Sequence, residues 1–339
     1  MKKLQNSLFI TRQKSYVHKQ RETIVVEQES EKILQIPIHA IKSIFCFGNV
    51  MVSPFLLGFC AENGVGLAFF TEYGRFLARI QGPQSGNVLL RRIQYEKTKS
   101  APLDVARAII AAKIVSSRSV LQRHIRNYGS QDDVVKVIGR LKHNLEQARV
   151  DPSLDRLRGT EGVAAANYFS VFQHLVRVEN DAGFAFNGRN KRPPTDPINA
   201  MLSFLYSVLG NDISAALQGV GLDPQVGFLH TDRPGRDSLA MDLLEELRAW
   251  WVDRLVLTQV NRREIKARDF SQAVSGAVTM SEAARKALLK AYQEKKHEEV
   301  EHPYTKEKLP IGLIPHMQAM LLASHLRGDL ECYPPFVYR

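Results

Sequence analysis

The sequence is poor in cysteine, and the spacing of its cysteines is not that of a disulfide framework or a zinc-binding motif. The 339 residues include three cysteines, Cys46, Cys60 and Cys332, and no two of them form a CxxC pair. This spacing argues against a disulfide framework and against a structural zinc site. Cys46 and Cys60 lie in apolar runs, so we interpret them as small buried hydrophobic residues.

Long hydrophobic runs are also missing. No stretch approaches the roughly 18 uninterrupted apolar residues of a membrane-spanning helix. The N-terminal segment MKKLQNSLFITRQ lacks the long apolar core of a secretory signal. We therefore expect no membrane span and a cytoplasmic location. A GxxxxGKS or GxxxxGKT phosphate loop is absent too, which leaves nucleotide hydrolysis without support.

What the chain has in excess is positive charge. The formal net charge is +11 at pH 7. A surplus of this size favours a polyanionic partner, because Lys and Arg release counterions from phosphates. General solubility explains the same surplus, so charge alone does not decide between the two. The length exceeds what one hydrophobic core usually serves, which predicts two domains.

The periodicity of hydrophobic residues changes near residue 86. Before it, short β-favouring runs alternate with turn residues, and Ser53 would cap one helix. After it, apolar residues recur three or four positions apart, as in amphipathic helices. The sequence therefore predicts an α+β fold, with a small β-sandwich-like domain at residues 1–85 and a larger all-α domain at residues 86–339.

The expected elements of both domains can be given by residue number. Strands are predicted at 15–20, 23–28, 32–38, 41–47, 66–71 and 76–80, with a turn at 72–74. The main helices are predicted at 101–126, 131–149, 160–176, 196–209, 212–219, 237–259, 281–297 and 313–326.

One acid stands out in the motif Gly159-Thr160-Glu161-Gly162. Thr160 would cap a helix and place Glu161 in its first turn, where the helix dipole favours an acid. The simple interpretation is that Glu161 only stabilises the start of the helix and has no catalytic role. The small residues that follow, at 162 and 164–166, leave room for a metal ion to approach the carboxylate.

A second group of candidate residues lies in GFLHTDRPGRDSLAMDLLEELR, residues 227–248. His230 precedes a turn, and a helix beginning near residue 237 puts Asp242 on one face with Glu245 or Glu246. Imidazole and carboxylates without thiolate suit Mg²⁺ or Mn²⁺. The competing interpretation is a surface histidine beside a solvated helix face.

Basic residues surround these acids in the sequence. Phosphodiester chemistry uses divalent ions together with arginines that hold the flanking phosphates. Any single one of these side chains is equally well a solvated surface charge. The candidate DNA contacts are Arg189, Lys191, Arg192, Arg233, Arg236 and Arg248.

The segment from His297 to His302 is set aside as a metal motif. Its histidines are five residues apart, whereas two ligands on one helical face need a spacing of four. Pro303 would also end a helix there, so we interpret the segment as a charged helix end.

Three ordered motifs resemble a known family. They are GTEG-AA-YF at 159–169, DPINAMLSFLYS at 196–207, and H-x-x-R-P-G-R-x-S-L-x-x-D-L-x-E-E-x-R at 230–248. Together they are similar to the CRISPR-associated integrase of spacer acquisition, the CRISPR-associated protein 1 family, and the resemblance covers essentially the whole chain. Length and motif details resemble the subtype I-C branch.

The resemblance implies a metal-dependent DNA endonuclease and integrase with a helical catalytic domain. Its implied metal ligands are Glu161, His230 and Glu245, with Asp242 as a further catalytic acid and Glu246 as a rival to Glu245. The implied reaction is transesterification, in which a 3′-hydroxyl of a short DNA fragment attacks the CRISPR repeat.

The resemblance also implies an assembly. The β domain would carry a homodimer contact, and a small CRISPR adaptation protein would join the dimers in a heterohexamer on double-stranded DNA. Two alternatives stay open at this point. One is a non-catalytic DNA-binding scaffold, and the other is a dimeric structural adaptor.

Overall fold

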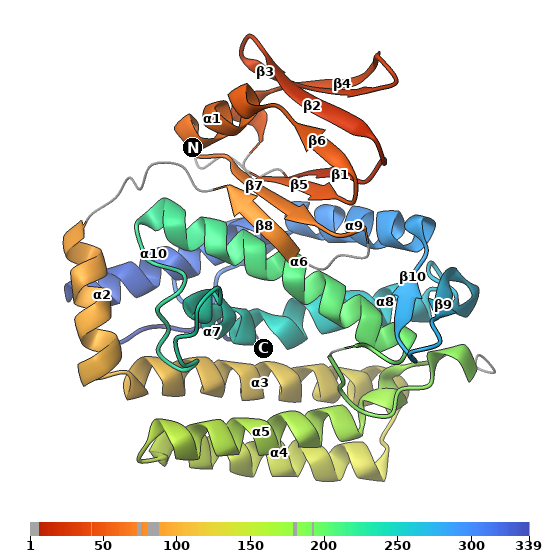
Figure 1. The fold of residues 1–339 in the computed structure, drawn as a ribbon. Helices are drawn as coiled ribbons and strands as arrows, with labels where there is room; N and C mark the ends of the chain where they lie inside the picture. Colours follow the sequence, from red (N-terminus) through yellow and green to blue (C-terminus); the bar gives the residue numbers. More distant parts are fainter. Residues whose placement is uncertain are drawn as a thin grey trace.

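Two four-stranded sheets form the N-terminal part of the protein, at one end of the molecule (Figure 1). The strand orders are β4-β3-β2-β6 and β1-β5-β7-β8. The computed structural model describes residues 7–41, 43–72, 76–80, 88–178, 182–191 and 193–338. The strands are β1 Ser7–Ile10, β2 Ser15–Gln20, β3 Thr23–Gln28, β4 Glu31–Pro37, β5 Ser43–Phe47, β6 Val50–Val52, β7 Gly66–Phe70 and β8 Phe76–Ile80.

The two sheets share one apolar core with a short helix. Val17, Ile24 and Ile44 are fully buried in it, as is Cys60 from α1 (Pro54–Glu62). The hydroxyl of Ser53 accepts the N–H of Leu56 and caps α1 as predicted. The β-sandwich-like prediction is confirmed, although β1 and β6 were not expected. Residues 73 and 74 of the predicted turn lie outside the described residues.

The second sheet also packs on the helical part of the chain. Phe45, Phe47 and Phe70 belong to the helical core, and the Phe47 ring lies 5.7 Å from the Phe204 ring. β8 adds a polar contact, because Arg79 donates from both terminal nitrogens to the carboxylate of Asp237. The sheet therefore ties the two parts together through both apolar and charged contacts.

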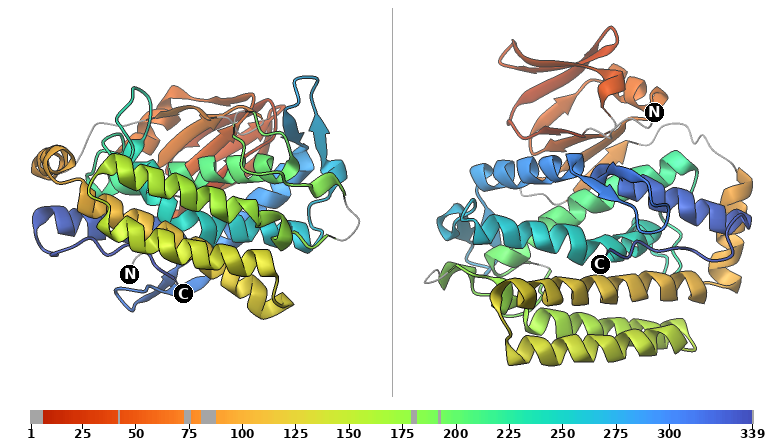
Figure 2. Two further views of the ribbon diagram at one scale, coloured as in Figure 1. Left: turned by 90° about the horizontal axis from the view of Figure 1, so that it is seen from below. Right: turned by 180° about the vertical axis from the view of Figure 1, so that it is seen from behind.

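Helices make up most of the remaining chain. Helices α3, α4 and α5 lie side by side at the end opposite the strands, and α6 crosses between them and the sheet (Figures 1 and 2). The helices are α2 Val88–Ser100, α3 Leu103–Tyr128, α4 Asp132–Val150, α5 Leu154–Ser170, α6 Pro197–Val220, α7 Ser238–Leu247, the π-helical η4 Arg248–Asp253, α8 Arg254–Asn261, α9 Glu282–His297 and α10 Ile314–Arg327.

The prediction of an all-α second domain is wrong in one respect. Two short antiparallel hairpins interrupt the helices, and three residue pairs join the two strands of each hairpin. They are β9 Phe270–Gln272 with β10 Val278–Met280, and β11 Glu299–Glu301 with β12 Lys308–Pro310. Short 3-10 turns are η1 Ile38–Ala40, η2 Phe172–Leu175, η3 Ala182–Phe184, η5 Ala267–Asp269 and η6 Ile311–Leu313.

The start of α5 differs from the prediction. The helix begins at Leu154, after Ser153 caps it by accepting the N–H of Arg156. Thr160 lies inside the helix, and its hydroxyl donates to Asp151 at 2.6 Å. Glu161 is therefore a mid-helix residue, so the interpretation of it as a first-turn acid is wrong. Ser153 supplies the cap that was assigned to Thr160.

Helix α6 is continuous where two helices were predicted. The helix continues through Gly210, and a methyl group at this position would lie 3.1 Å from the Met241 side chain. Glycine at this point allows α6 and α7 to approach closely. α6 is also long and apolar enough to span a membrane, but 78% of that window is buried inside the protein. Its apolar surface therefore serves the core.

Glu246 anchors the C-terminal tail. It is fully buried, and its carboxylate accepts hydrogen bonds from the Tyr333 hydroxyl (2.7 Å), the Gln318 amide (3.0 Å) and the Phe336 N–H (2.7 Å). Burial raises the pKa of Glu246 to about 7 in spite of these donors. The tail is thus held over α7 and α10 by one buried carboxyl group.

Replacing that group should loosen the tail. We expect Glu246→Ala to lower the free energy of unfolding by about 3 kcal/mol, because three buried donors lose their acceptor. Urea unfolding measures this loss, and limited proteolysis should then cut the tail. Glu299→Ala removes an exposed carboxylate and serves as the control. Equal stability of the two variants would contradict the anchoring role.

Candidate active site

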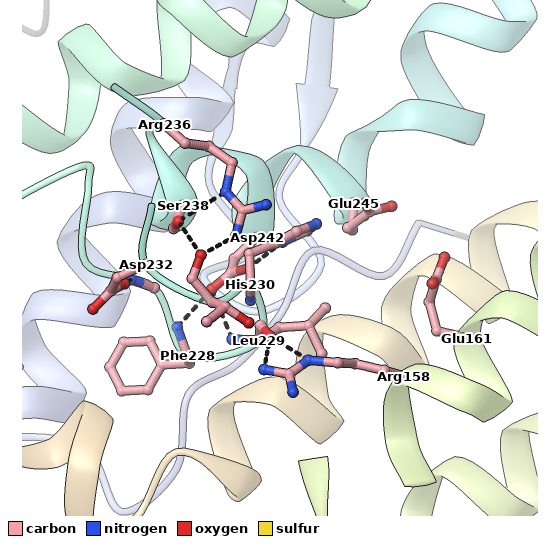
Figure 3. Close-up of polar contacts among 12 residues, drawn as sticks. Arg158, Glu161, Phe228, Leu229, His230, Asp232, Arg236, Ser238, Asp242 and Glu245 are labelled. Carbon is pink, nitrogen blue, oxygen red and sulfur yellow. Dashed lines mark hydrogen bonds and ion pairs between the residues drawn. The ribbon is translucent and has the colours of Figure 1, made fainter. Parts of the chain in front are cut away.

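A cavity of about 640 Å³ lies between α3, α5 and the α7–η4 run. It is lined by Lys113 from α3, Glu161 from α5, Glu245 from α7 and His230 from the loop before α7. Figure 3 shows Glu161 and Glu245 extending toward the same space from their separate helices. The fold therefore brings the three predicted ligands to one cavity from distant parts of the chain.

Asp242 positions His230. The carboxylate is fully buried, and its Oδ2 accepts the backbone N–H groups of Phe228 and Leu229 at 2.7 and 3.0 Å. Its Oδ1 accepts the N–H of His230 at 3.0 Å and lies 2.6 Å from the ring Nδ1 (Figure 3). A carboxylate only accepts, so Nδ1 carries the proton and Nε2 keeps its lone pair in the neutral ring. Both oxygens of Asp242 are occupied, which makes it a positioning residue.

Two further side chains hold the loop at residues 221–237 that carries His230. Arg158 of α5 donates from Nε and Nη2 to the carbonyl of Leu229, at 2.9 and 2.6 Å. The buried amide of Gln94 donates to the carbonyls of Asp223 and Val226, both at 2.8 Å. The histidine thus sits on a loop that is fixed from three sides.

The two glutamates form ion pairs with basic side chains. The ammonium group of Lys113 contacts Oε1 of Glu161 and lies 2.7 Å from Oε2 of Glu245. Arg248 lies 2.9 Å from the other oxygen of Glu245. Burial would raise the pKa of Glu245, but Arg248 and Lys113 bring it down to about 2. Glu245 is therefore ionised at neutral pH, and it is not the solvated side chain of the competing interpretation.

Only one of the adjacent glutamates reaches the cavity. Glu245 lines it, whereas Glu246 is turned away and bound to the C-terminal tail. The two residues differ by one position, about 100° around the helix, so a single helix presents them to different surroundings. The structure thus favours Glu245 over Glu246 as a ligand.

The donors around the cavity suit a hard divalent cation by their chemistry. Two carboxylates already balance an ammonium group, and the imidazole Nε2 is available. Among the residues that the structure describes, no three His, Cys, Asp or Glu side chains stand close enough to share one ion. Lys113 stands between the two carboxylates, so its side chain would have to move for Glu161 and Glu245 to hold an ion together.

A buried polar cluster forms the cavity wall behind the glutamates. The carboxylate of Asp253 accepts the hydroxyl groups of Tyr206 at 2.5 Å and Tyr168 at 3.1 Å. Burial raises the pKa of Asp253 to about 6, although both tyrosines donate to it. Arg189 and Arg248 lie over the Tyr206 ring, at 5.4 and 4.9 Å from its centre. The π-helical turn η4 delivers both Arg248 and Asp253, which a regular helix would present on different faces.

The predicted DNA contacts divide into groups. Arg189, Lys191 and Arg248 line the cavity. Arg233 is exposed on the loop, away from the cavity lining. Arg236 donates to the Thr231 carbonyl of its own loop. Arg192 lies outside the described residues.

The set-aside histidine motif is structural. His297 is the exposed last residue of α9, whereas His302 is buried and lies 2.9 Å from the Gln318 side chain. The two histidines therefore lie in different surroundings, and the interpretation as a charged helix end holds for His297. His302 is a core residue.

Sequence reasoning missed Lys113, Tyr168, Tyr206 and Asp253. Tyr206 lies inside the DPINAMLSFLYS motif, which could have marked it. Lys113 follows the apolar positions of α3 and stands out as a charge beside a buried stripe. Tyr168 likewise lies inside the GTEG-AA-YF motif. Asp253 carries no local signal, because its contact with the two tyrosines depends on how η4 packs against α5 and α6.

Gly227 makes the Asp242 contacts possible. A methyl group at this position would lie 2.8 Å from Oδ2 of Asp242 and 2.9 Å from the Ser238 backbone. We expect Gly227→Ala to cost about 1–3 kcal/mol in urea unfolding, the usual range for overpacking. Gly139→Ala on the exposed face of α4 meets nothing within 4 Å and should stabilise by about 0.5–1 kcal/mol. Wild-type or higher stability of Gly227→Ala would refute the close approach.

The chain is similar to known proteins over nearly all of its length. It is 47% identical to a protein of Chlorobaculum tepidum named CRISPR-associated endonuclease Cas1 1, with 100% of both chains covered. Among solved structures it is similar to a casposase bound to integration product, with a TM-score of 0.84, 22% identity, and 98% and 94% of the two chains covered.

A further similar structure is that of a Cas6-RT-Cas1–Cas2 complex, with a TM-score of 0.83 and 19% identity, covering 100% of this chain and 36% of that one. At these low sequence identities, the two solved structures show similarity of fold only. The family model described as CRISPR associated protein Cas1 matches residues 8–294. The chain therefore belongs to the Cas1 family of CRISPR-associated proteins.

Proposed function

We propose that this protein is a divalent-metal-dependent DNA endonuclease and integrase, which inserts short foreign DNA fragments into a CRISPR array by transesterification. The observation that carries the proposal is the cavity that Glu161, His230 and Glu245 line together with Arg and Lys side chains. The names of the endonuclease relative and of the casposase structure support the same chemistry.

Glu161, Glu245 and Nε2 of His230 are the groups that would hold Mg²⁺ or Mn²⁺. Such an ion, when bound, polarises the scissile phosphate and stabilises the departing oxygen. Asp242 keeps His230 in the tautomer that offers Nε2, because its Oδ1 accepts a hydrogen bond from the Nδ1–H group. Arg248 fixes Glu245 and keeps it ionised.

The cavity rim would hold the reacting phosphates. Arg189, Lys191 and Arg248 line the same cavity as the glutamates, and arginine binds phosphate through two parallel N–H groups. In the reaction the 3′-oxygen of the fragment forms a new bond to phosphorus, while the bond to the 3′-oxygen of the repeat strand breaks. One phosphodiester replaces another, and with water as the attacking group the same site would cut DNA.

We further propose that the protein forms a homodimer that assembles with a small partner protein. Apolar side chains are exposed on the N-terminal part, with Phe55 at 84% and Met51 at 60%, and these would suit a homodimer contact. The likeness to a Cas6-RT-Cas1–Cas2 complex supports a small adaptation protein as the partner, in a heterohexamer on double-stranded DNA. Membership of subtype I-C stays a prediction.

The metal ligands can be tested by substitution. We expect Glu161→Gln and His230→Ala each to lower Mn²⁺-dependent strand cleavage and joining by about 100-fold or more, because each removes a ligand. A labelled branched DNA reports both reactions on a gel. Glu146→Gln, an exposed carboxylate of α4, should keep full activity.

The same assay separates the enzyme from the scaffold alternative. Activity that survives EDTA, or that survives in both variants, would contradict metal-dependent catalysis at this site. DNA binding without turnover, together with no Mn²⁺ binding in calorimetry, would favour the non-catalytic scaffold.

Lys113 should compete with the ion. We expect Lys113→Met to bind Mn²⁺ about tenfold more tightly in calorimetry, since no ammonium group has to leave the carboxylates. The variant should also melt at a lower temperature than the wild type in EDTA, because two close carboxylates lose their cation. Lys142→Met on the exposed face of α4 is the matched control. Equal or weaker Mn²⁺ binding by Lys113→Met would rule out the competition.

A further inference from the structure

Three polar side chains of the DPINAMLSFLYS segment lie along one face of α6. Asn199, Ser203 and Tyr206 are four and three residues apart, which places them on the same side of the helix. Most of α6 is apolar and buried in the core. A row of polar groups on such a helix needs partners, because a buried polar group costs free energy unless it is hydrogen-bonded.

The partner of all three side chains is Arg189. Nη1 of its guanidinium donates to Oδ1 of Asn199 at 2.7 Å, and Nη2 donates to Oγ of Ser203 at 3.0 Å. The ring of Tyr206 faces the guanidinium, and its centre lies 5.4 Å from Cζ of Arg189. We call Asn199, Ser203 and Tyr206 the arginine cradle.

Asn199 also fixes the backbone on both sides of Arg189. The side chain is fully buried, and its Nδ2 donates to the Gly188 carbonyl at 2.8 Å. Its Oδ1 accepts the backbone N–H of Asn190 at 3.2 Å. The second hydrogen of Nδ2 goes to Asp196, the N-cap of α6, at 2.5 Å. One amide therefore joins the start of α6 to the loop and to the side chain of Arg189.

The acceptors that hold Arg189 are neutral. Among the residues that the structure describes, no carboxylate forms an ion pair with it. Asp196 and Asp253 lie near, but Asp196 binds the start of α6 and Asp253 accepts two tyrosine hydroxyl groups. Burial lowers the pKa of Arg189, and Tyr206 and Asp253 offset part of this effect. The guanidinium stays charged in spite of such a shift, so it brings a positive charge to the cavity that no acid binds directly.

Arg189 also has an unused donor at the active-site cavity. The residue lines this cavity, and its Nε is buried without a hydrogen-bond partner among the described residues. A buried N–H group costs free energy unless it is paired, so this atom suits an acceptor that enters the cavity. A guanidinium binds an ionised oxygen acceptor more strongly than a neutral one, and phosphate oxygens are such acceptors.

We propose that Asn199 and Ser203 are positioning residues for the DNA reaction, which hold Arg189 by neutral acceptors so that its charge stays available for a phosphate of the substrate. A carboxylate in their place would bind the guanidinium and neutralise it. Apolar side chains would leave it without a fixed direction. The role rests on the proposed function for the identity of the substrate, and it gives the polar residues of the DPINAMLSFLYS segment a task that metal binding does not explain.

A double-mutant cycle tests whether the arginine cradle acts through Arg189. Fluorescence anisotropy measures the affinity for a labelled branched DNA in EDTA, so neither metal binding nor turnover contributes. We expect Arg189→Gln to weaken binding about tenfold, and the slope of log K against log salt should become shallower by about one, because one phosphate contact is lost. Ser203→Ala should weaken binding about fivefold in the wild type but less than about twofold in Arg189→Gln, because the side chain that it positions is then gone.

Two further variants of α6 separate positioning from a structural role. Ser203→Asp places a carboxylate beside Arg189, which would hold the loop as firmly as the hydroxyl does. It should nevertheless lower DNA affinity about as much as Arg189→Gln, because the guanidinium is neutralised. Ser207→Ala is the matched control, since this partly buried hydroxyl donates to the Ser203 carbonyl of its own helix and should change affinity in neither background.

Asn199 is tested in the same cycle. Asn199→Ala breaks four hydrogen bonds, so urea unfolding first establishes that the variant is folded. Its loss of DNA affinity should exceed that of Ser203→Ala and should also disappear in the Arg189→Gln background. If Asn199→Ala does not fold, the Ser203 variants decide the outcome.

The outcomes separate the arginine cradle from the proposed function. The positioning role is overturned if Ser203→Ala binds DNA like the wild type, if it weakens binding equally in both backgrounds, or if Ser203→Asp keeps wild-type affinity. A wild type that does not bind the branched DNA overturns it as well. Metal-dependent cleavage that requires Glu161, together with no coupling in the cycle, would support the enzyme and contradict the cradle. Coupling in a protein that cuts no DNA with Mn²⁺ would support the cradle and contradict the enzyme.

Discussion

The buried carboxylate of Asp242 is the constraint on which the site depends. It joins α7 to the preceding loop through backbone N–H groups of three successive residues and the ring of His230. Such a group is stable only where several donors meet it, so the loop and the helix have to be placed together. Gly227 leaves the space that this approach requires, and Arg158 holds the loop from α5. The position of the histidine therefore follows from core packing.

Charge is organised around this fixed point. Glu245 is buried and remains ionised because Lys113 and Arg248 flank it. Lys113 also contacts Glu161, so α3, α5 and α7 are joined by one ammonium group. Acids gather at one end of the face of α3, and arginine side chains line a second cavity farther along it.

Several elements could be predicted because their signals are local. The strands of the N-terminal part alternate and end at turn residues, and Ser53 caps α1 as its side-chain chemistry suggests. The errors arose where a local signal was outweighed by packing. Thr160 looks like a cap, but Ser153 begins the helix earlier and Thr160 bonds to Asp151 instead. Gly210 looks like a break, but it lets α7 approach α6.

By itself the sequence determined which residues are the candidates for the chemistry. The motifs pointed to Glu161, His230 and Glu245, because the residue types that a metal site needs can be recognised in the sequence whatever surrounds them. Only the tertiary structure decided their roles. In the structure Asp242 contacts the ring of His230, and Glu246 binds the C-terminal tail. Lysine and arginine side chains from neighbouring helical segments form ion pairs with the acids. These assignments depend on contacts between residues far apart in the chain, which no local pattern encodes.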